Sequence, residues 1–393
     1  MSLRRKLVWV SILYFAQGFP FGVAVDNLPV YFAAHGVSLQ QLGLMTMLGL
    51  PWTLKVFWSP LVDRFGDRRT WIVSCLVVMA ILSAIIPFFD PSQPTVFLWA
   101  LLFAFTTASA TQDVAIDAYT IGLVVPGEEG ATNSVRVSAY RAALLVSGGA
   151  LVILAGSASW SLAFWASAAI LLLMAAIARR SPSLAIPPPE RRAWLAPFVA
   201  WIRRPGALAI LFFVLTYKLA DASIAPMIKP FWLQSGLTVE EIGLVSTTFG
   251  VFATVAGAAL GGALTSRFGI FTGLWTLGLV QASASLGYAA AAYTEAGRPA
   301  IYAASMVESF TAGMGSAAFL AFLMNICDKA QAATEYALLS AIFALPRFVV
   351  GGASGWLTVR MGFANYFFLT FFLAFPAYGL LPWAREWIRE EAQ

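Results

Sequence analysis

Eleven ionisable side chains fall inside long apolar stretches of this chain, and they are the residues whose types could support chemistry. They are Asp26, Lys55, Asp113, Asp117, Arg136, Arg141, Lys218, Asp221, Lys229, Glu308 and Arg347. A charge in hydrocarbon is costly, so an embedded acid or base marks a candidate path for a proton, an ion or a ligand. The single histidine, His35, and two cysteines, Cys75 and Cys327, suggest no metal site, disulfide framework or histidine-based catalysis. We therefore expect no cofactor, no metal and no enzymatic activity.

The spacing of the embedded charges leaves two interpretations open for each pair. Lys218 and Asp221 are three residues apart and share a helical face, so a structural ion pair is as reasonable as a role in substrate binding. Glu308 lies among Ser309, Thr311 and Gly313 with no cation nearby in sequence. A carboxyl group in such surroundings could exchange a proton during a transport cycle.

The two acids Asp113 and Asp117 are four residues apart, and two bare carboxylates on one face resist each other without cations or a proton. Lys55, Arg136 and Arg141 come from neighbouring apolar stretches and could neutralise them. That network could carry protons or could only brace the amino-terminal half. Asp117 is the stronger candidate for a structural brace.

The elements that position these residues must be membrane helices. Hydrophobic residues make up 60% of the 393 residues, charged residues 11%, and the mean hydropathy is +0.79. Soluble proteins carry about 25% charged residues, and a helix of about 20 apolar residues spans a bilayer. The composition excludes soluble enzymes, nucleic-acid binders, disulfide scaffolds and disordered proteins. The net charge of +5 is better explained by arginines in cytoplasmic loops than by a nucleic-acid partner.

Breaks at charge clusters and at Gly, Pro and Ser residues divide the chain into twelve candidate spans. They run near 7–33, 40–62, 70–89, 94–124, 132–155, 160–178, 207–233, 239–265, 270–293, 299–327, 332–358 and 364–383. The basic, proline-rich composition of residues 179–206 predicts a cytoplasmic linker. It joins an amino-terminal six-helix bundle (1–178) to a carboxy-terminal one (207–393). The basic start resembles a signal peptide, but no small-residue cleavage site follows, so we expect an uncleaved first helix.

The distribution of Lys and Arg predicts that both termini lie in the cytoplasm. With that orientation, loops on the cytoplasmic side hold sixteen of the 24 basic residues. The opposite loops hold only two, Arg298 and Arg360, and the other six fall within spans.

The two halves are internal repeats with the same orientation. The segment 36–43, Gly-Val-Ser-Leu-Gln-Gln-Leu-Gly, matches 236–243, Gly-Leu-Thr-Val-Glu-Glu-Ile-Gly, at an offset of 200 residues. The third, sixth, ninth and twelfth candidate spans carry no charge, as expected of helices that face lipid. Parallel six-helix repeats of this kind are typical of the major facilitator architecture, in which the substrate site lies near the membrane midplane between the halves.

The loop Ser59-Pro-Leu-Val-Asp63-Arg64-Phe-Gly66-Asp-Arg68-Arg69 resembles the signature loop of the major facilitator superfamily, although that signature normally begins with Gly. The resemblance implies a cytoplasmic latch that works through charge pairs. Asp63 and Arg64 match the family positions, with Asp117 as their expected partner.

More specific motifs resemble the AmpG-like muropeptide permease and acetyl-CoA transporter family over nearly the whole chain. These motifs are 50–60, Ala110-Thr-Gln-Asp113, Tyr217-Lys218-Leu-Ala-Asp221 and 313–319. The resemblance implies proton-coupled import of a bulky anionic organic solute across a bacterial inner membrane. Nothing in the sequence requires more than a monomer. The chain is also similar to siderophore permeases of the same branch, so a ferric chelate stays open as the cargo. A lipid flippase or an acyl-CoA carrier fits less well.

Residues and resemblance together give three sets of candidate positions. For substrate binding they are Gln17, Asn27, Lys55, Gln112, Arg141, Tyr217, Lys218 and Arg347. For proton coupling they are Asp26, Asp113, Asp221 and Glu308, and for the latch Asp63, Arg64 and Asp117. The expected partners are the solute, protons and the lipid bilayer.

Overall fold

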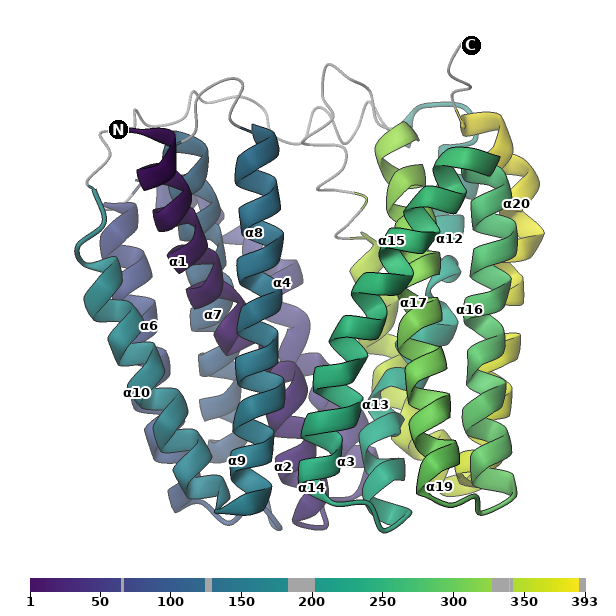
Figure 1. Cartoon of the computed structure of the whole chain (residues 1–393), viewed down its shortest axis with the longest axis horizontal. Coiled ribbons are helices and arrows are strands. Elements are labelled where there is room, and N and C mark those ends of the chain that lie inside the picture. Colours follow the sequence, from purple (N-terminus) through teal and green to yellow (C-terminus); the bar gives the residue numbers. More distant parts are fainter. Residues whose placement is uncertain (65–66, 124–128, 183–201, 327–338, 340–341, 389–393) are drawn as a thin grey trace. The chain divides into compact units, whose positions relative to one another are not determined.

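The regular secondary structure of this protein is helical throughout the part that the computed structural model describes, which comprises residues 1–64, 67–123, 129–182, 202–326, 339 and 342–388 (Figure 1). Nine helical runs in these ranges are long and apolar enough to cross a membrane, judged by length and composition. The prediction of an all-α membrane protein is confirmed.

The nine runs differ from the twelve expected spans at three places. The expected span 40–62 is divided into short helices, and α7 (Val96–Leu123), with Gln112, Asp113 and Asp117 in its second half, is not among the nine. The third difference is Ile342–Trp387, a run of 46 residues that counts once. At 1.5 Å per residue, such a run would extend about 69 Å, more than twice a hydrocarbon core of about 30 Å. It turns at Gly362, where φ is 78° and ψ is 162°. The gap expected at 359–363 is therefore present as a turn.

The chain divides into two compact units, each of which borrows a short segment from the opposite half of the sequence. Unit 1 comprises Met1–Val37, Met47–Glu190 and Thr238–Thr248. Unit 2 comprises Ser38–Thr46, Arg191–Leu237 and Phe249–Gln393.

Most of unit 1 is a set of long helices, several of which contain a π-helical or 3₁₀ break. In chain order they are α1 (Leu3–Gly22), a π-helical segment (Val23–Asn27), α2 (Leu28–Ala34), a 3₁₀ segment (Met45–Gly49), α4 (Leu50–Leu54), a 3₁₀ turn (Lys55–Phe57), α5 (Ser59–Arg64), α6 (Arg68–Ile85), a 3₁₀ turn (Ile86–Phe88), α7, α8 (Glu129–Leu144), a π-helical segment (Leu145–Ala150), α9 (Leu151–Ser157) and α10 (Trp160–Ala178). From the other half come α14 (Val239–Glu241) and most of the π-helical segment Ile242–Phe249.

Unit 2 has longer helices with fewer π-helical or 3₁₀ breaks. They are α12 (Ala207–Tyr217), α13 (Leu219–Gln234), α15 (Gly250–Phe268), α16 (Ile270–Tyr293), α17 (Arg298–Ile326), α19 (Pro346–Phe372) and α20 (Phe375–Trp387), joined by the borrowed α3 (Leu39–Leu44). Pro346 is the first residue of α19 and follows a turn at Leu345, a position where proline is favoured.

The borrowed segments overlap the two copies of the sequence repeat, beginning at the third residue of each copy. Gly36 and Gly236 both have a φ of +77°, a conformation that favours glycine. Ser38 then caps α3 by accepting from the Gln41 amide, and Thr238 caps α14 in the same way through the Glu241 amide. The repeat thus encodes a sharp turn followed by a capped helix start. In unit 2, α3 packs against α19, and in unit 1, α14 packs against α9.

Glycines allow α15 and α17 to approach each other within unit 2. A Cβ atom on Gly257 would meet the backbone of Phe310, and one on Gly261 would meet the backbone of Met314. The two helix backbones are therefore in close contact at both positions. Gly262, by contrast, faces open space, because a Cβ atom there would have no neighbouring atom within 4 Å.

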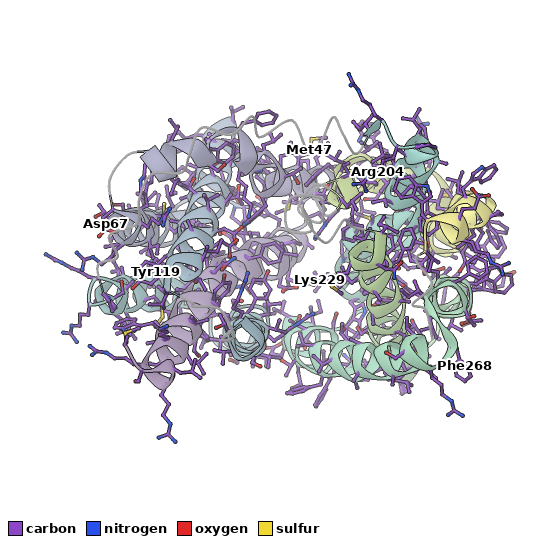
Figure 2. All side chains as sticks on the ribbon, turned by 90° about the horizontal axis from the view of Figure 1, so that it is seen from above. Met47, Asp67, Tyr119, Arg204, Lys229 and Phe268 are labelled. Atoms are coloured by element: carbon purple, nitrogen blue, oxygen red, sulfur yellow. The ribbon has the colours of Figure 1, made fainter. Side chains whose placement is uncertain are left out.

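Large apolar side chains cover much of the exterior of both units. Exposed residues of this kind include Val96, Ile121, Val349 and Phe268, the last of which is labelled at the edge of unit 2 in Figure 2. Such a surface is what lipid tails solvate.

Candidate functional site

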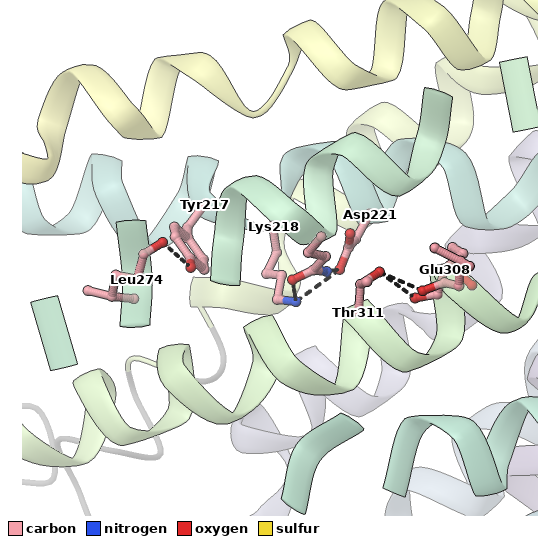
Figure 3. Close-up of polar contacts among 8 residues, drawn as sticks. Tyr217, Lys218, Asp221, Leu274, Glu308 and Thr311 are labelled. Carbon is pink, nitrogen blue, oxygen red and sulfur yellow. Dashed lines mark hydrogen bonds and ion pairs between the residues drawn. The ribbon is translucent and has the colours of Figure 1, made fainter. Parts of the chain in front are cut away.

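In unit 2, a charged cluster forms at the break between α12 and α13. Lys218 lies at this break, with φ −103° and ψ 17°, and its ammonium group donates to Asp221 Oδ2 at 3.0 Å (Figure 3). It also donates to Gln281 Oε1 of α16 at 2.6 Å, and Gln281 Nε2 donates to the same Asp221 oxygen. The side chain of Lys218 is 9% exposed and that of Asp221 is 30% exposed. The ion pair inferred from the three-residue spacing is present, but a third residue closes it into a ring.

Gln281 is the member of this ring that the sequence analysis missed. Its helix corresponds to the expected span 270–293, which was assigned a supporting role because it carries no charge. The sequence feature that could have identified Gln281 is an amide side chain in an otherwise apolar helix, because a buried amide needs hydrogen-bond partners.

Glu308 lies on α17 beside this ring. Its carboxylate interacts electrostatically with Asp221 and Lys218 and accepts from the Ser309 hydroxyl at 3.4 Å. The Thr311 hydroxyl instead bonds to the backbone oxygen of Glu308 at 3.1 Å (Figure 3). Within the described ranges the Glu308 carboxylate forms no salt bridge, whereas Asp221 does. Asp221 and Glu308 are therefore in different electrostatic settings.

In unit 1, the ammonium group of Lys55 is bonded to the Asp113 carboxylate of α7. Lys55 begins the 3₁₀ turn between α4 and α5, so both embedded lysines in these pairs lie at a helix break. The Trp58 indole donates to the Thr111 hydroxyl at 3.1 Å, which ties the same turn to α7 a second time.

Asp117, one turn further along α7, has different partners. It accepts from the Tyr14 hydroxyl of α1 at 2.6 Å and from Arg136 of α8 at 3.3 Å. The Arg136 guanidinium also lies 4.5 Å from the centre of the Tyr14 ring. Asp117 thus connects three helices of unit 1, as a brace would. The side chains of its expected latch partners, Asp63 and Arg64 on α5, lie outside the described part of the structure.

The expected neutralisation of the acid pair on α7 is confirmed for two of the three cations. Lys55 meets Asp113, and Arg136 meets Asp117. Arg141, half-buried on α8, forms no ion pair with any described residue and remains a substrate-binding candidate.

Several other candidate residues in unit 1 present buried polar atoms. Gln112 is fully buried and donates to the Ala16 carbonyl at 3.2 Å, which places it next to Gln17 of α1. The side-chain oxygens of Gln17, Gln112 and Asn27 are buried and have no hydrogen-bond partner among the described residues. Asp26 lies in the π-helical segment Val23–Asn27, against Gly148.

Two candidate substrate-binding residues of unit 2 lie in unlike surroundings. Tyr217 is buried in an aromatic core, stacked on Phe319 at 4.9 Å between ring centres, and its hydroxyl donates to the Leu274 carbonyl at 2.9 Å (Figure 3). Its hydroxyl is thus already engaged in holding α12 to α16. Arg347 is exposed near the start of α19.

Comparison with known proteins places this arrangement in a family. Residues 10–219 match the model of the Major Facilitator Superfamily. The chain is 32% identical over 386 residues to the anhydromuropeptide permease of Escherichia coli, an alignment that covers 95% of this chain and 79% of the permease. The protein belongs to the anhydromuropeptide permease family of the major facilitator superfamily. It is a multi-pass membrane transporter and not an enzyme.

Other relatives agree with this family assignment. An uncharacterized protein of Haemophilus influenzae is 31% identical over 402 residues, covering 96% of this chain and 94% of that protein. A putative transporter of Rickettsia conorii is 28% identical over 399 residues, covering 96% and 95%. Among solved structures, a bacterial homologue of the lysosomal transporter Spinster has a TM-score of 0.75 at 16% identity, covering 99% of both chains. The nucleoside transporter NupG has 0.68 at 14% identity, covering 98% of this chain and all of NupG. These two likenesses show the major facilitator fold alone.

Proposed function

We propose that this permease imports a bulky anionic, muropeptide-like solute across a bacterial inner membrane by alternating access, and that protons drive the import. The observation that carries the choice of solute is the 32% identity, over 95% of the chain, to a permease named for anhydromuropeptides. Except for Tyr217 and Asp221, the substrate-binding and proton-coupling positions predicted from the sequence belong to this proposal.

The proposed topology has twelve spans in two six-helix bundles, 1–178 and 207–393, with both termini in the cytoplasm. The excess of Lys and Arg in the loops assigned to that side, sixteen against two, supports the orientation. The 46-residue run Ile342–Trp387, which turns at Gly362, supports two spans where one is counted.

Proton coupling is supported by the unequal surroundings of Asp221 and Glu308 in unit 2. Asp221 is held by Lys218 and Gln281, whereas Glu308 has only a serine hydroxyl as a direct partner among the described residues. An acid without a bound cation is the better proton carrier, because neutralisation by a proton removes an unpaired charge. One charge that crosses 100 mV of membrane potential contributes about 2.3 kcal/mol, so one or two protons suffice for useful accumulation.

The test is uptake of a labelled anhydromuropeptide into proteoliposomes with an imposed inward proton gradient. We expect accumulation that a protonophore abolishes, and we expect Glu308→Gln to abolish accumulation while it preserves solute exchange at equal concentrations. Uptake that ignores the protonophore would refute proton coupling. Uptake of a ferric siderophore in place of the muropeptide would refute the solute assignment.

A further inference from the structure

The ring of Lys218, Asp221 and Gln281 at the α12–α13 break contains one residue without a charge, Gln281. We propose that Gln281 is a positioning residue that clamps Asp221 to Lys218, keeps Asp221 anionic through the transport cycle, and so leaves Glu308 as the acid that exchanges a proton in unit 2. This inference rests on the proposed function, which it deepens by dividing the work between the two acids.

The hydrogen bonds around Gln281 have the directions that a clamp requires. Its carboxamide oxygen accepts from Lys218 and its nitrogen donates to Asp221 Oδ2, the same oxygen that Lys218 contacts. Both bonds of the amide are to charged groups, and such bonds are about twice as strong as neutral ones. Protonation of Asp221 would weaken both bonds to this oxygen, so the closed ring opposes it.

The clamp also ties the break between α12 and α13 to a neighbouring helix. Lys218 and Asp221 lie on either side of Leu219, where α13 begins, and the bond between them reaches no other helix. Gln281 supplies the bonds to α16. Without it, the ion pair would be free to move with the break.

A glycine on α17 provides the space for this amide. A Cβ atom at Gly315 would collide with Gln281 Oε1, and the remaining close atoms are also in the Gln281 side chain. The Gly313-Met-Gly315 motif therefore serves two purposes. Gly313 lies against the backbone of Thr254 on α15, and Gly315 lies against the clamp.

The titratable groups that face the clamp come from several elements packed around α16. Lys218 and Asp221 belong to the break, and Glu308 comes from α17. The hydroxyls of Tyr217 on α12 and Tyr378 on α20 lie beside Gly278, one turn before Gln281. The charged residues of α15 and α19 are near helix ends or beside the Gly362 turn: Arg267, Arg347 and Arg360.

The deciding variant is Gln281→Glu, because a neutral carboxyl group has a carbonyl and an O–H where the amide has a carbonyl and an N–H. When protonated, the introduced carboxyl can close the same ring. When ionised, it has no donor and faces Asp221 with a like charge. Loss of a hydrogen bond to a charged group costs about 1.5–3 kcal/mol, so at about pH 8 we expect solute exchange at least about tenfold below wild type. As the pH falls from about 8 to about 5.5, we expect solute exchange by Gln281→Glu to rise toward that of wild type, because a growing fraction of the introduced carboxyl is then protonated.

Exchange is measured in proteoliposomes with equal pH on both sides, and each variant is compared with wild type at the same pH. Gln281→Met, which has a similar shape and no hydrogen bonds to offer, should lose exchange equally at both pH values. Gln234→Glu makes the same change at the exposed end of α13 and should match wild type throughout. Two results would overturn the clamp. One is a ratio of Gln281→Glu exchange to wild-type exchange that stays the same at both pH values. The other is solute exchange by Gln281→Met at the wild-type rate.

Two further measurements keep the inference separate from the proposed function. If wild-type protein exchanges no muropeptide, the proposed solute fails, and the clamp is judged by melting temperature instead. Gln281→Glu should then lose stability relative to wild type as pH rises, and a difference in melting temperature that does not change with pH would contradict the clamp.

If Gln281→Glu does not fold, Gly315→Ala takes its place. It should reduce exchange or melting temperature, whereas Gly262→Ala should not, and equal behaviour of the two alanine variants would count against the clamp.

Discussion

Replacing Lys55 by methionine should destabilise this permease more than replacing Lys55 and Asp113 together. The ammonium group of Lys55 is bonded to the Asp113 carboxylate, and the two side chains are 30% and 11% exposed. Lys55→Met leaves the less exposed of the two, an aspartate, without its cation. Removing one partner of a buried ion pair costs about 3–5 kcal/mol, and the partial exposure of Lys55 argues for the lower limit, about 3 kcal/mol.

The reverse substitution should cost less. After Asp113→Asn, the more exposed Lys55 can turn its flexible side chain toward water, and the asparagine oxygen can still accept a hydrogen bond, so we expect about 1–2 kcal/mol. The double variant leaves no unpaired charge and should cost about 2 kcal/mol. The resulting coupling energy, about 2–3 kcal/mol, lies in the range measured for residues in direct contact.

The assay is unfolding of the purified protein in mixed detergent micelles, followed by the fluorescence of its 14 tryptophans. Asp90→Asn, a matched change in an exposed loop, should stay within about 0.5 kcal/mol of wild type. Additive effects of Lys55→Met and Asp113→Asn would refute the reasoning, because they would show that the contact contributes nothing. A Lys55→Met protein as stable as wild type would do the same.

Two further predictions concern contacts within unit 2. Gly257→Ala should destabilise the protein by about 1–3 kcal/mol, since its Cβ would strike the backbone of Phe310. Gly262→Ala, with open space around it, should be neutral or stabilising by up to about 1 kcal/mol, and thermal unfolding of both variants tests this difference. Tyr217→Phe should lose about 1 kcal/mol of stability with its hydrogen bond to Leu274 and should keep its solute affinity. A Tyr217→Phe protein of normal stability and reduced affinity would instead assign this hydroxyl to the substrate.

The sequence predicted the elements of this fold well because hydrophobic runs and the repeat carry that information locally. The copies at 36–43 and 236–243 could be recognised as one motif, and both form a left-handed glycine turn followed by a capped helix. What the repeat could not predict is that each copy belongs to the compact unit formed mostly by the opposite half. That assignment depends on packing against α19 and α9, which no local pattern encodes.

The candidate site was predictable to the extent that charge is costly in a membrane. Because of that cost, Lys55, Asp113, Lys218 and Asp221 were candidates from the sequence alone. In the structure Lys55 pairs with Asp113 and Lys218 pairs with Asp221, as charge balance requires. An uncharged partner is harder to find, because a polar amide in an apolar helix has many possible roles. The role of Gln281 is identified by the folded structure, in which α16 packs beside the α12–α13 break and Gln281 bonds to Lys218 and Asp221.

The two ion pairs place a lysine at a helix break in both units, but they hold that break in different ways. In unit 1 the counter-ion of Lys55 comes from α7, so the pair itself ties the break to another helix. In unit 2 the counter-ion of Lys218 lies three residues along the same segment, and the pair alone ties the break to nothing else. The attachment of the pair to α16 comes from a neutral amide, beside the neutral bond from Tyr217 to the Leu274 carbonyl. Such bonds can be exchanged for bonds to water or solute without leaving a charge unpaired. Unit 2 is therefore the unit in which the break can be released at the smaller cost in free energy.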